Sequence, residues 1–269
     1  MNKKKKTAGG FSAIVSFLAI AIALVAGALI YSKVFGDPSN FVDRDPAGEP
    51  MEGNYYGVIY KGGFIVPILV AINLIIIIFS LERLVTLLLA NGKGNTDKFI
   101  SSLKGHMGKE KKDFSGAIAL CDKQKGSLAN VVRAGLVKYE HVSGDTSMSK
   151  EQKLESLKKE LEEASALELP MLSKNLAVLS TSASIATLIG LIGTVLGMIR
   201  SFAAMSKGSP DTAALATGIS EALINTALGI TASTIAIIMY NVFSTKIDTM
   251  TYSIDEASFT IVQDFSASN

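Results

Sequence analysis

Ionisable and hydroxyl-bearing residues interrupt two of the most apolar stretches of the chain, and their types suit the handling of protons. Thr194 and Arg200 lie in the stretch "GLIGTVLGMIRSF", and Glu221 and Thr226 lie in the stretch "ISEALINTALGITAST". A carboxylate takes up and releases a proton, whereas a threonine hydroxyl only passes hydrogen bonds along near neutral pH. Because an ionisable side chain within an apolar span is costly, Glu221 is a candidate functional residue.

Hydroxyl side chains also recur at every seventh position along the first of these stretches and the residues before it. This step keeps four residues on one side of a helix: Ser180, Thr187, Thr194 and Ser201. Such hydroxyls often donate to a carbonyl of their own helix, so one alone would indicate little. Four in register favour a polar lumen, which Thr226 of the second stretch would also line.

Arg200 and Glu221 can form an ion pair if the two stretches are helices that run in opposite directions. Arg200 lies six residues beyond Thr194, and Glu221 lies five residues before Thr226. At about 1.5 Å per residue, the charged residues lie level when the threonines do. The alternative is that each charged side chain reaches separately to the membrane surface. No titratable residue lies deeper than Glu221, so a proton path needs a carboxylate from elsewhere.

Small residues form a separate stripe on each of the two stretches. Gly190, Gly193 and Gly197 follow steps of three and four, and so do four residues of the second stretch: Gly218, Ala222, Asn225 and Gly229. Helices in lipid associate where small residues let their backbones approach closely. The two helices are therefore expected to pack on each other or on neighbouring copies.

The elements that must carry these residues are membrane helices. The 269 residues are 48% hydrophobic and 19% charged, with a mean hydropathy of +0.36. Four apolar stretches each suit a helix of about 20 residues across the hydrocarbon layer: Phe11–Ile30, Phe64–Leu81, Leu176–Ala204 and Ala213–Phe243. The sequence thus predicts an all-α, polytopic membrane bundle.

A net charge of +2, without a basic stripe, argues against nucleic acid as a partner.

Basic residues beside the spans predict the orientation, because cytoplasmic flanks collect Lys and Arg. The start "MNKKKK" and the lysine-rich segment after the second span are placed in the cytoplasm, and the acidic segment before that span is placed outside. The predicted order is an N-terminal anchor (1–31), a periplasmic segment (32–63), a span (64–90), a cytoplasmic helical domain (91–175), a span (176–205), a periplasmic turn (206–212), a span (213–243) and a cytoplasmic C-terminal helix (244–269).

The first span has an alternative interpretation. A lysine-rich start, an apolar run and "AGA" at Ala26–Ala28 also describe a cleavable signal peptide. We expect an uncleaved anchor, because the apolar run exceeds the usual signal core of about 7–15 residues.

Long amphipathic helices are predicted in the cytoplasm. From Lys150 apolar residues recur at steps of three and four, and this helix leads into the third span with Pro170 as a kink or a new start. One face of the tail is apolar and must pack on something, most simply the long helix: Ile247, Met250, Ile254, Ala257, Ile261 and Phe265.

No residue set suggests an enzyme, a cofactor or a metal. Cys121 is the only cysteine, and His106 and His141 lack the spacing of metal ligands. The run "GKGN" lacks the Ser/Thr and upstream glycine of a phosphate-binding loop. The chain is therefore expected to have no catalytic residues.

The two stretches "IGLIGTVLGMIRSF" and "ISEALINTALGITASTIAIIMYNVF" resemble the paired signature of the MotA/TolQ/ExbB proton channel family, most closely its ExbB members. The resemblance covers about Gly62 to Ser266, with Glu82 and Arg83 at the cytoplasmic end of the family's first span. The sequence departs from the family at Thr187 and Ile235, where prolines are usual, and in its additional first span.

The resemblance implies an inner-membrane subunit of a Gram-negative bacterium that uses the proton motive force. It implies a homo-oligomeric, five-fold ring around an ExbD-like single-span partner whose aspartate carries the proton, acting on a TonB-like protein. Thr194 and Thr226 would be pore-lining threonines and Glu221 the intramembrane glutamate. A TolQ-like or gliding-type motor, or a scaffold that conducts no protons, is the alternative.

Overall fold

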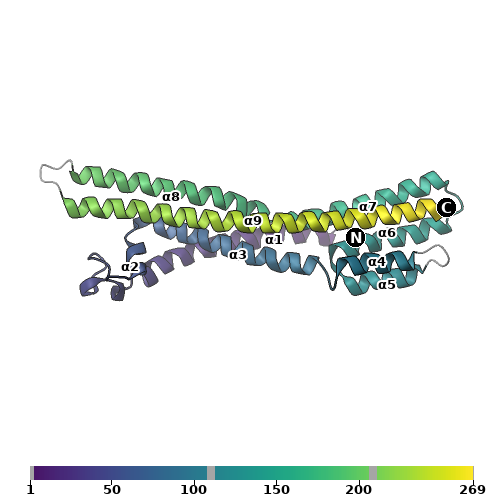
Figure 1. Ribbon diagram of the computed structural model, residues 1–269, viewed down its shortest axis with the longest axis horizontal. Coiled ribbons are helices and arrows are strands. Elements are labelled where there is room, and N and C mark those ends of the chain that lie inside the picture. The colour runs from purple at the N-terminus through teal and green to yellow at the C-terminus, as the bar shows by residue number, and fades with distance from the viewer. Residues whose placement is uncertain (1–2, 108–112, 206–210, 269) are drawn as a thin grey trace. The chain divides into compact units, whose positions relative to one another are not determined.

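The computed structural model describes residues 3–107, 113–205 and 211–268, and this part of the chain is helical and contains no strand (Figure 1). Four of its helices are long and apolar enough to cross a membrane. The predicted all-α, multi-pass membrane bundle is thereby confirmed. The turn expected at 206–212 falls mostly outside the described residues.

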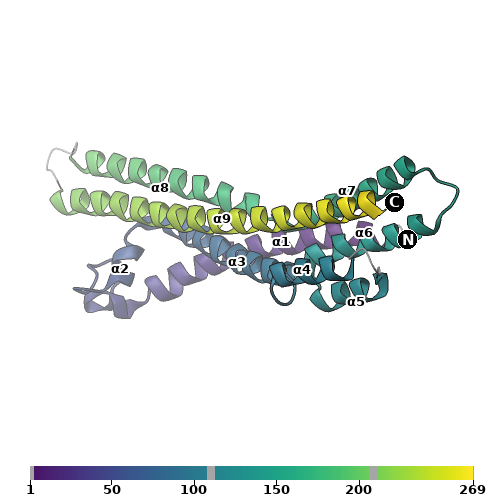
Figure 2. The same ribbon diagram turned by 45° about the vertical axis from the view of Figure 1, so that its right-hand side comes forward.

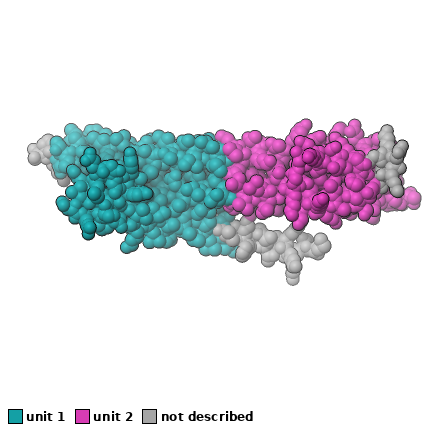
Figure 3. All heavy atoms as spheres, turned by 60° about the horizontal axis from the view of Figure 1, so that its bottom comes forward, with its two compact units in different colours: residues 1–81, 177–240 teal, residues 82–176, 241–269 magenta. Residues whose placement is uncertain are grey.

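The helices follow one another along the chain with short connections. They are α1 (Lys3–Ile30), η1 (Tyr31–Phe35), η2 (Pro38–Asn40), η3 (Val42–Arg44), α2 (Tyr55–Tyr60), η4 (Gly63–Ile65), α3 (Val66–Ala90), α4 (Thr96–His106), α5 (Phe114–Gln124), α6 (Gly126–Gly144), α7 (Lys150–Ser173), α8 (Leu176–Met205) and α9 (Thr212–Ser268). The chain divides into two compact units, coloured separately in Figure 3: unit 1 comprises residues 1–81 and 177–240, and unit 2 comprises residues 82–176 and 241–269.

In unit 1, α1 packs on the start of α3, and the segment between them is ordered by aromatic contacts. A Cβ atom at Gly27 would come within 2.7 Å of the Pro67 carbonyl oxygen, so the two backbones touch. The Tyr31 and Tyr60 rings stack with centroids 4.7 Å apart. Lys61 Nζ donates to the Pro46 and Ala47 carbonyls at 3.0 and 2.9 Å.

The small-residue stripes bring α8 and the 212–240 part of α9 into contact within one chain, side by side in Figure 1. A Cβ atom at Gly193 would come within 2.5 Å of Asn225 Cβ, and one at Gly197 within 2.6 Å of the Gly218 carbonyl oxygen. Of the two expected arrangements, packing within the chain is the one observed.

In unit 2, α4, α5, α6, α7 and the tail of α9 lie together (Figure 2). These helices share one hydrophobic core. Tyr139 of α6 is fully buried, and its ring lies edge-on to Phe265 of α9 with centroids 4.7 Å apart. Its hydroxyl donates to Asp264 Oδ2 at 3.0 Å. All six apolar tail residues that the sequence places on one face are buried. Four of them, Ile254, Ala257, Ile261 and Phe265, belong to the core that α6 and α7 also form.

Two boundaries differ from expectation. Helix α7 continues through Pro170 to Ser173, and the break falls at Asn175, whose φ is 60°. Asparagine adopts this left-handed conformation more readily than most residues, which makes it a common helix terminator. Helix α9 runs without interruption from Thr212 to Ser268, because no glycine or proline lies between the apolar span and the amphipathic tail.

Candidate functional site

Glu221 and Arg200 form a close ion pair in unit 1. Arg200 Nη1 lies 2.7 and 2.6 Å from the two carboxylate oxygens of Glu221. Glu221 is only 4% exposed, whereas the Arg200 side chain is 52% exposed and its guanidinium carbon lies 5.6 Å from the centre of the Phe64 ring. The carboxylate is thus enclosed by the protein, and the arginine faces outward.

The hydroxyls of Thr194 and Thr226 lie in direct hydrogen-bonding contact between α8 and α9. Thr194 Oγ1 is also 3.2 Å from the Gly190 carbonyl oxygen and 3.4 Å from that of Ala222. Both threonines are partly exposed. Since an O–H group both donates and accepts, the two hydroxyls are able to relay a hydrogen bond from one helix to the other.

The other hydroxyls of the seven-residue series lie in different surroundings. Ser180 and Thr187 are exposed, and they donate to their own helix at the Ala177 and Ala183 carbonyls. Both line a shallow surface groove of unit 1 together with Ser184, Ser233 and Tyr240 of α8 and α9. Ser201 is buried and donates to the Leu215 carbonyl at 3.1 Å.

Asn225 and the turn before α3 also belong to this site. Asn225 is fully buried, and its Nδ2 donates to the Gly62 carbonyl at 2.8 Å. The next residue, Gly63, has a φ of 76° and lies so close that a Cβ atom would collide with Glu221 Oε1. The sequence signal that could have indicated this turn is the pair of glycines, Gly62 and Gly63, directly before the second span.

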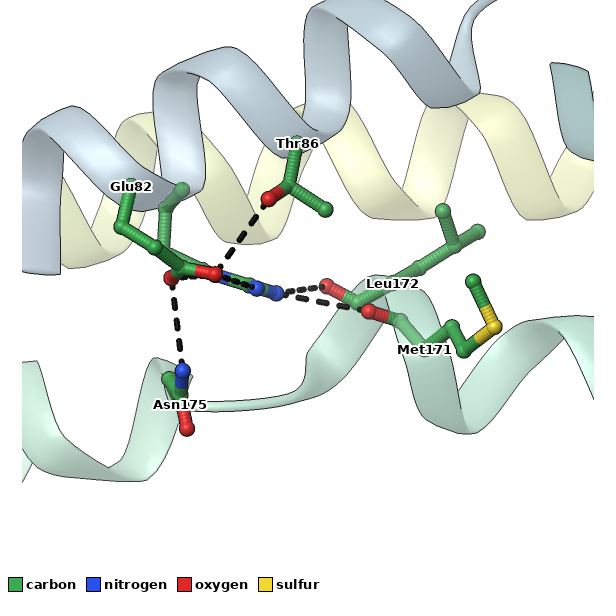
Figure 4. Close-up of polar contacts among 6 residues, drawn as sticks. Glu82, Thr86, Met171, Leu172 and Asn175 are labelled. Atoms are coloured by element: carbon green, nitrogen blue, oxygen red, sulfur yellow. Dashed lines mark hydrogen bonds and ion pairs between the residues drawn. The ribbon is translucent and has the colours of Figure 1, made fainter. Parts of the chain in front are cut away.

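A second polar cluster, in unit 2, joins the end of α3 to the end of α7 (Figure 4). The buried Arg83 donates to both carboxylate oxygens of Glu82, at 2.7 and 2.6 Å, and Nη1 donates to the Met171 and Leu172 carbonyls at 3.3 Å. Glu82 also accepts from Thr86 and Asn175, each at 3.3 Å. Arg83 therefore caps carbonyls that the last turn of a helix leaves unpaired.

The described residues contain no group of three or more His, Cys, Asp or Glu side chains that could hold a metal ion. Within the span portions 177–205 and 211–240, the acidic and basic residues are Arg200, Asp211 and Glu221. The side chains of this site are able to form hydrogen bonds and, at Glu221, to exchange a proton.

A family profile described as the MotA/TolQ/ExbB proton channel family matches residues 123–256, about half of the chain. The chain belongs to this family. The match includes Thr194, Arg200, Glu221, Asn225 and Thr226. Members of the family work in membrane complexes with partner proteins, and the family is one of transport proteins, not of enzymes. A search of curated protein sequences gives no significant match.

Proposed function

We propose that the chain is an ExbB-like subunit of a proton-driven motor in the inner membrane of a Gram-negative bacterium. In this proposal five copies form a ring around an ExbD-like single-span partner, and the complex drives a TonB-like protein. The termini of the ring subunit and residues 91–175 lie in the cytoplasm. The contact between the Thr194 and Thr226 hydroxyls, with the buried Glu221 carboxylate five residues before Thr226 on α9, is the observation that carries the proposal.

The geometry supports a role for the partner's aspartate. The Glu221 carboxylate is paired with Arg200, and the two threonine hydroxyls do not titrate near neutral pH. A carboxylate from a partner helix beside the threonines would complete the path. One charge that crosses 100 mV releases about 2.3 kcal/mol, so a few protons supply enough energy to shift a weakly packed helix.

Proton flux into vesicles tests the proposal. The purified chain alone is expected to conduct poorly, and the complex that co-purifies with it from native membranes is expected to conduct, as reported by a pH-sensitive dye. Equal leakage by the chain alone would refute the dependence on a partner carboxylate. A complex that carries no protons under any applied potential would instead favour a scaffold role.

Mass analysis of the same co-purified complex tests the partners. A single-span protein with an aspartate in its span, together with a TonB-like protein, is the expected result. A stator partner of another kind would assign the chain to the TolQ-like or gliding-type members.

A further inference from the structure

The turn at Gly62–Gly63 covers Glu221, and Asn225 holds that turn in place. Gly63 lies against Glu221 Oε1 so closely that no side chain fits between them. Glu221 is one helical turn before Asn225 on α9, and the Asn225 amide donates to the Gly62 carbonyl at 2.8 Å. The turn thus contacts α9 at two successive positions of the same face.

Packing alone does not explain an asparagine at this position. Asn225 is fully buried, and its Oδ1 has no hydrogen-bond partner in the described part of the chain. Leaving a buried acceptor unpaired is unfavourable, so the oxygen of this amide does not stabilise the fold. The amide therefore contributes through its donor, and that donor reaches the turn.

The turn is also tied to the segment before it. Lys61, its neighbour, donates to the Pro46 and Ala47 carbonyls. Tyr60, one residue earlier, stacks on Tyr31, the first residue of η1. A movement of residues 31–61 would therefore pull on the turn that covers Glu221.

We propose that Asn225 is a positioning residue that latches the Gly62–Gly63 turn over Glu221 and thereby controls the access of water to this carboxylate. The inference rests on the proposed function, in which Glu221 borders the proton path. With the latch closed, Glu221 stays paired with Arg200. When the latch opens, the carboxylate meets solvent and exchanges protons.

Labelling of Glu221 by a lipid-soluble carbodiimide tests the latch in the full-length chain in native membranes. Asn225→Ala removes the donor, and Asn225→Leu removes it while keeping most of the volume. Both are expected to raise labelling of the peptide that contains Glu221 by about fivefold or more, because the hydrogen bond from Asn225 to Gly62 ties the turn to α9. Asn73→Ala is the matched control, since the Asn73 amide donates to Leu69 of its own helix.

Glu82 provides an internal reference, because it is ion-paired in the same chain but lies in unit 2. A latch raises labelling of Glu221 alone, whereas general loosening of the protein raises labelling of both carboxylates. Unchanged Glu221 labelling in both Asn225 variants, or an equal rise at Glu82, would overturn the proposal.

A second variant opens the same latch from the other side. Gly63→Ala places a Cβ atom against Glu221 Oε1 and should raise labelling as Asn225→Ala does. The double variant should label no more than either single variant, and additive effects would argue against one shared latch. Labelling needs neither partner nor potential, so a complex that fails to conduct would refute the proposed function and leave this result intact.

Discussion

Thr226 allows the role of a hydroxyl to be separated from the role of packing. Thr226→Val keeps the shape of the side chain but removes the group that contacts Thr194. We expect normal protein levels and ring size, with partner-dependent proton flux reduced about tenfold or more, which corresponds to about 1.4 kcal/mol for one lost hydrogen bond. Flux into vesicles and transport by cells measure the effect.

Thr231→Val is the matched control for this experiment. The exposed Thr231 donates to the Ala227 carbonyl of its own helix, so the loss of its hydroxyl should leave flux unchanged. Full activity of Thr226→Val at wild-type protein levels would show that protons travel elsewhere.

Because Arg200 and Glu221 form an ion pair, we expect the stability losses of their single variants not to add in the double variant. Arg200→Ala leaves a buried carboxylate unpaired and should destabilise the assembled protein. Adding Glu221→Gln removes that unpaired charge, so the double variant should recover about 1–3 kcal/mol relative to the sum of the single variants. Thermal unfolding in detergent measures the stability of the natural chain, the two single variants and the double variant. Additive losses of stability would indicate that the two residues act independently.

The sequence left open whether Arg200 and Glu221 form an ion pair or reach separately to the membrane surface. Helix rise places the two residues level only when Thr194 and Thr226 are level, and the structure contains both contacts. The contact between Asn225 and Gly62 was not predictable in the same way. It depends on a turn with a positive φ that belongs to neither apolar span, and the spacing within a helix carries no information about such a turn. The four hydroxyls of the seven-residue series share a helix face but not an environment within this chain: Ser201 is buried, whereas Ser180 is exposed.

At the scale of whole helices, the close contact between α8 and α9 depends on their glycines. Gly193→Leu would drive a branched side chain into Asn225, whose Cβ atom lies only 2.5 Å from the position of a Cβ at residue 193. We expect the helices to separate, with smaller or broader assemblies in native mass measurements. Val195→Leu is the control, because residue 195 is exposed on the same helix. A normally sized, active ring from Gly193→Leu would contradict this prediction.

The helix boundaries show which signals a sequence carries. Apolar length identified α3 and α8, and three- and four-residue steps identified the buried face of the α9 tail. The sequence left Pro170 as a kink or a new helix start, and the structure has it inside α7, which ends at Ser173. The actual break needs Asn175 in the left-handed region and Arg83 on the carbonyls before it. The second of these conditions is a contact between residues remote in sequence.

At the scale of the whole molecule, chemical labelling of Cys121 measures how often the core of unit 2 opens. It is the only cysteine of the chain, it is 2% exposed, and burial raises the pKa of its thiol to about 12. Labelling with iodoacetamide at pH 8 should be about 100-fold or more slower than in urea, because the thiol reacts only after the core opens. Fast labelling of the native protein would show that the core is open in solution.

The same thiol predicts a loss of stability in alkali. Its pKa is higher in the folded state than the usual 9.0, so the folded state keeps the proton longer. The contribution to stability is complete below pH 9 and falls as the pH rises from 9 toward 12. Cys121→Ser removes this thiol, and the variant should lose less stability over that range than the natural chain.

The cluster around Arg83 has a consequence for the order of synthesis. The carbonyls that its guanidinium caps belong to residues 88 and 89 positions later in the chain. When α3 emerges from the ribosome, Arg83 therefore has Glu82 and water as partners, and nothing yet fixes this end of the helix. The cap forms only after the ribosome has translated all of α7. Until then the nascent chain must keep a cation that is destined for burial in contact with water.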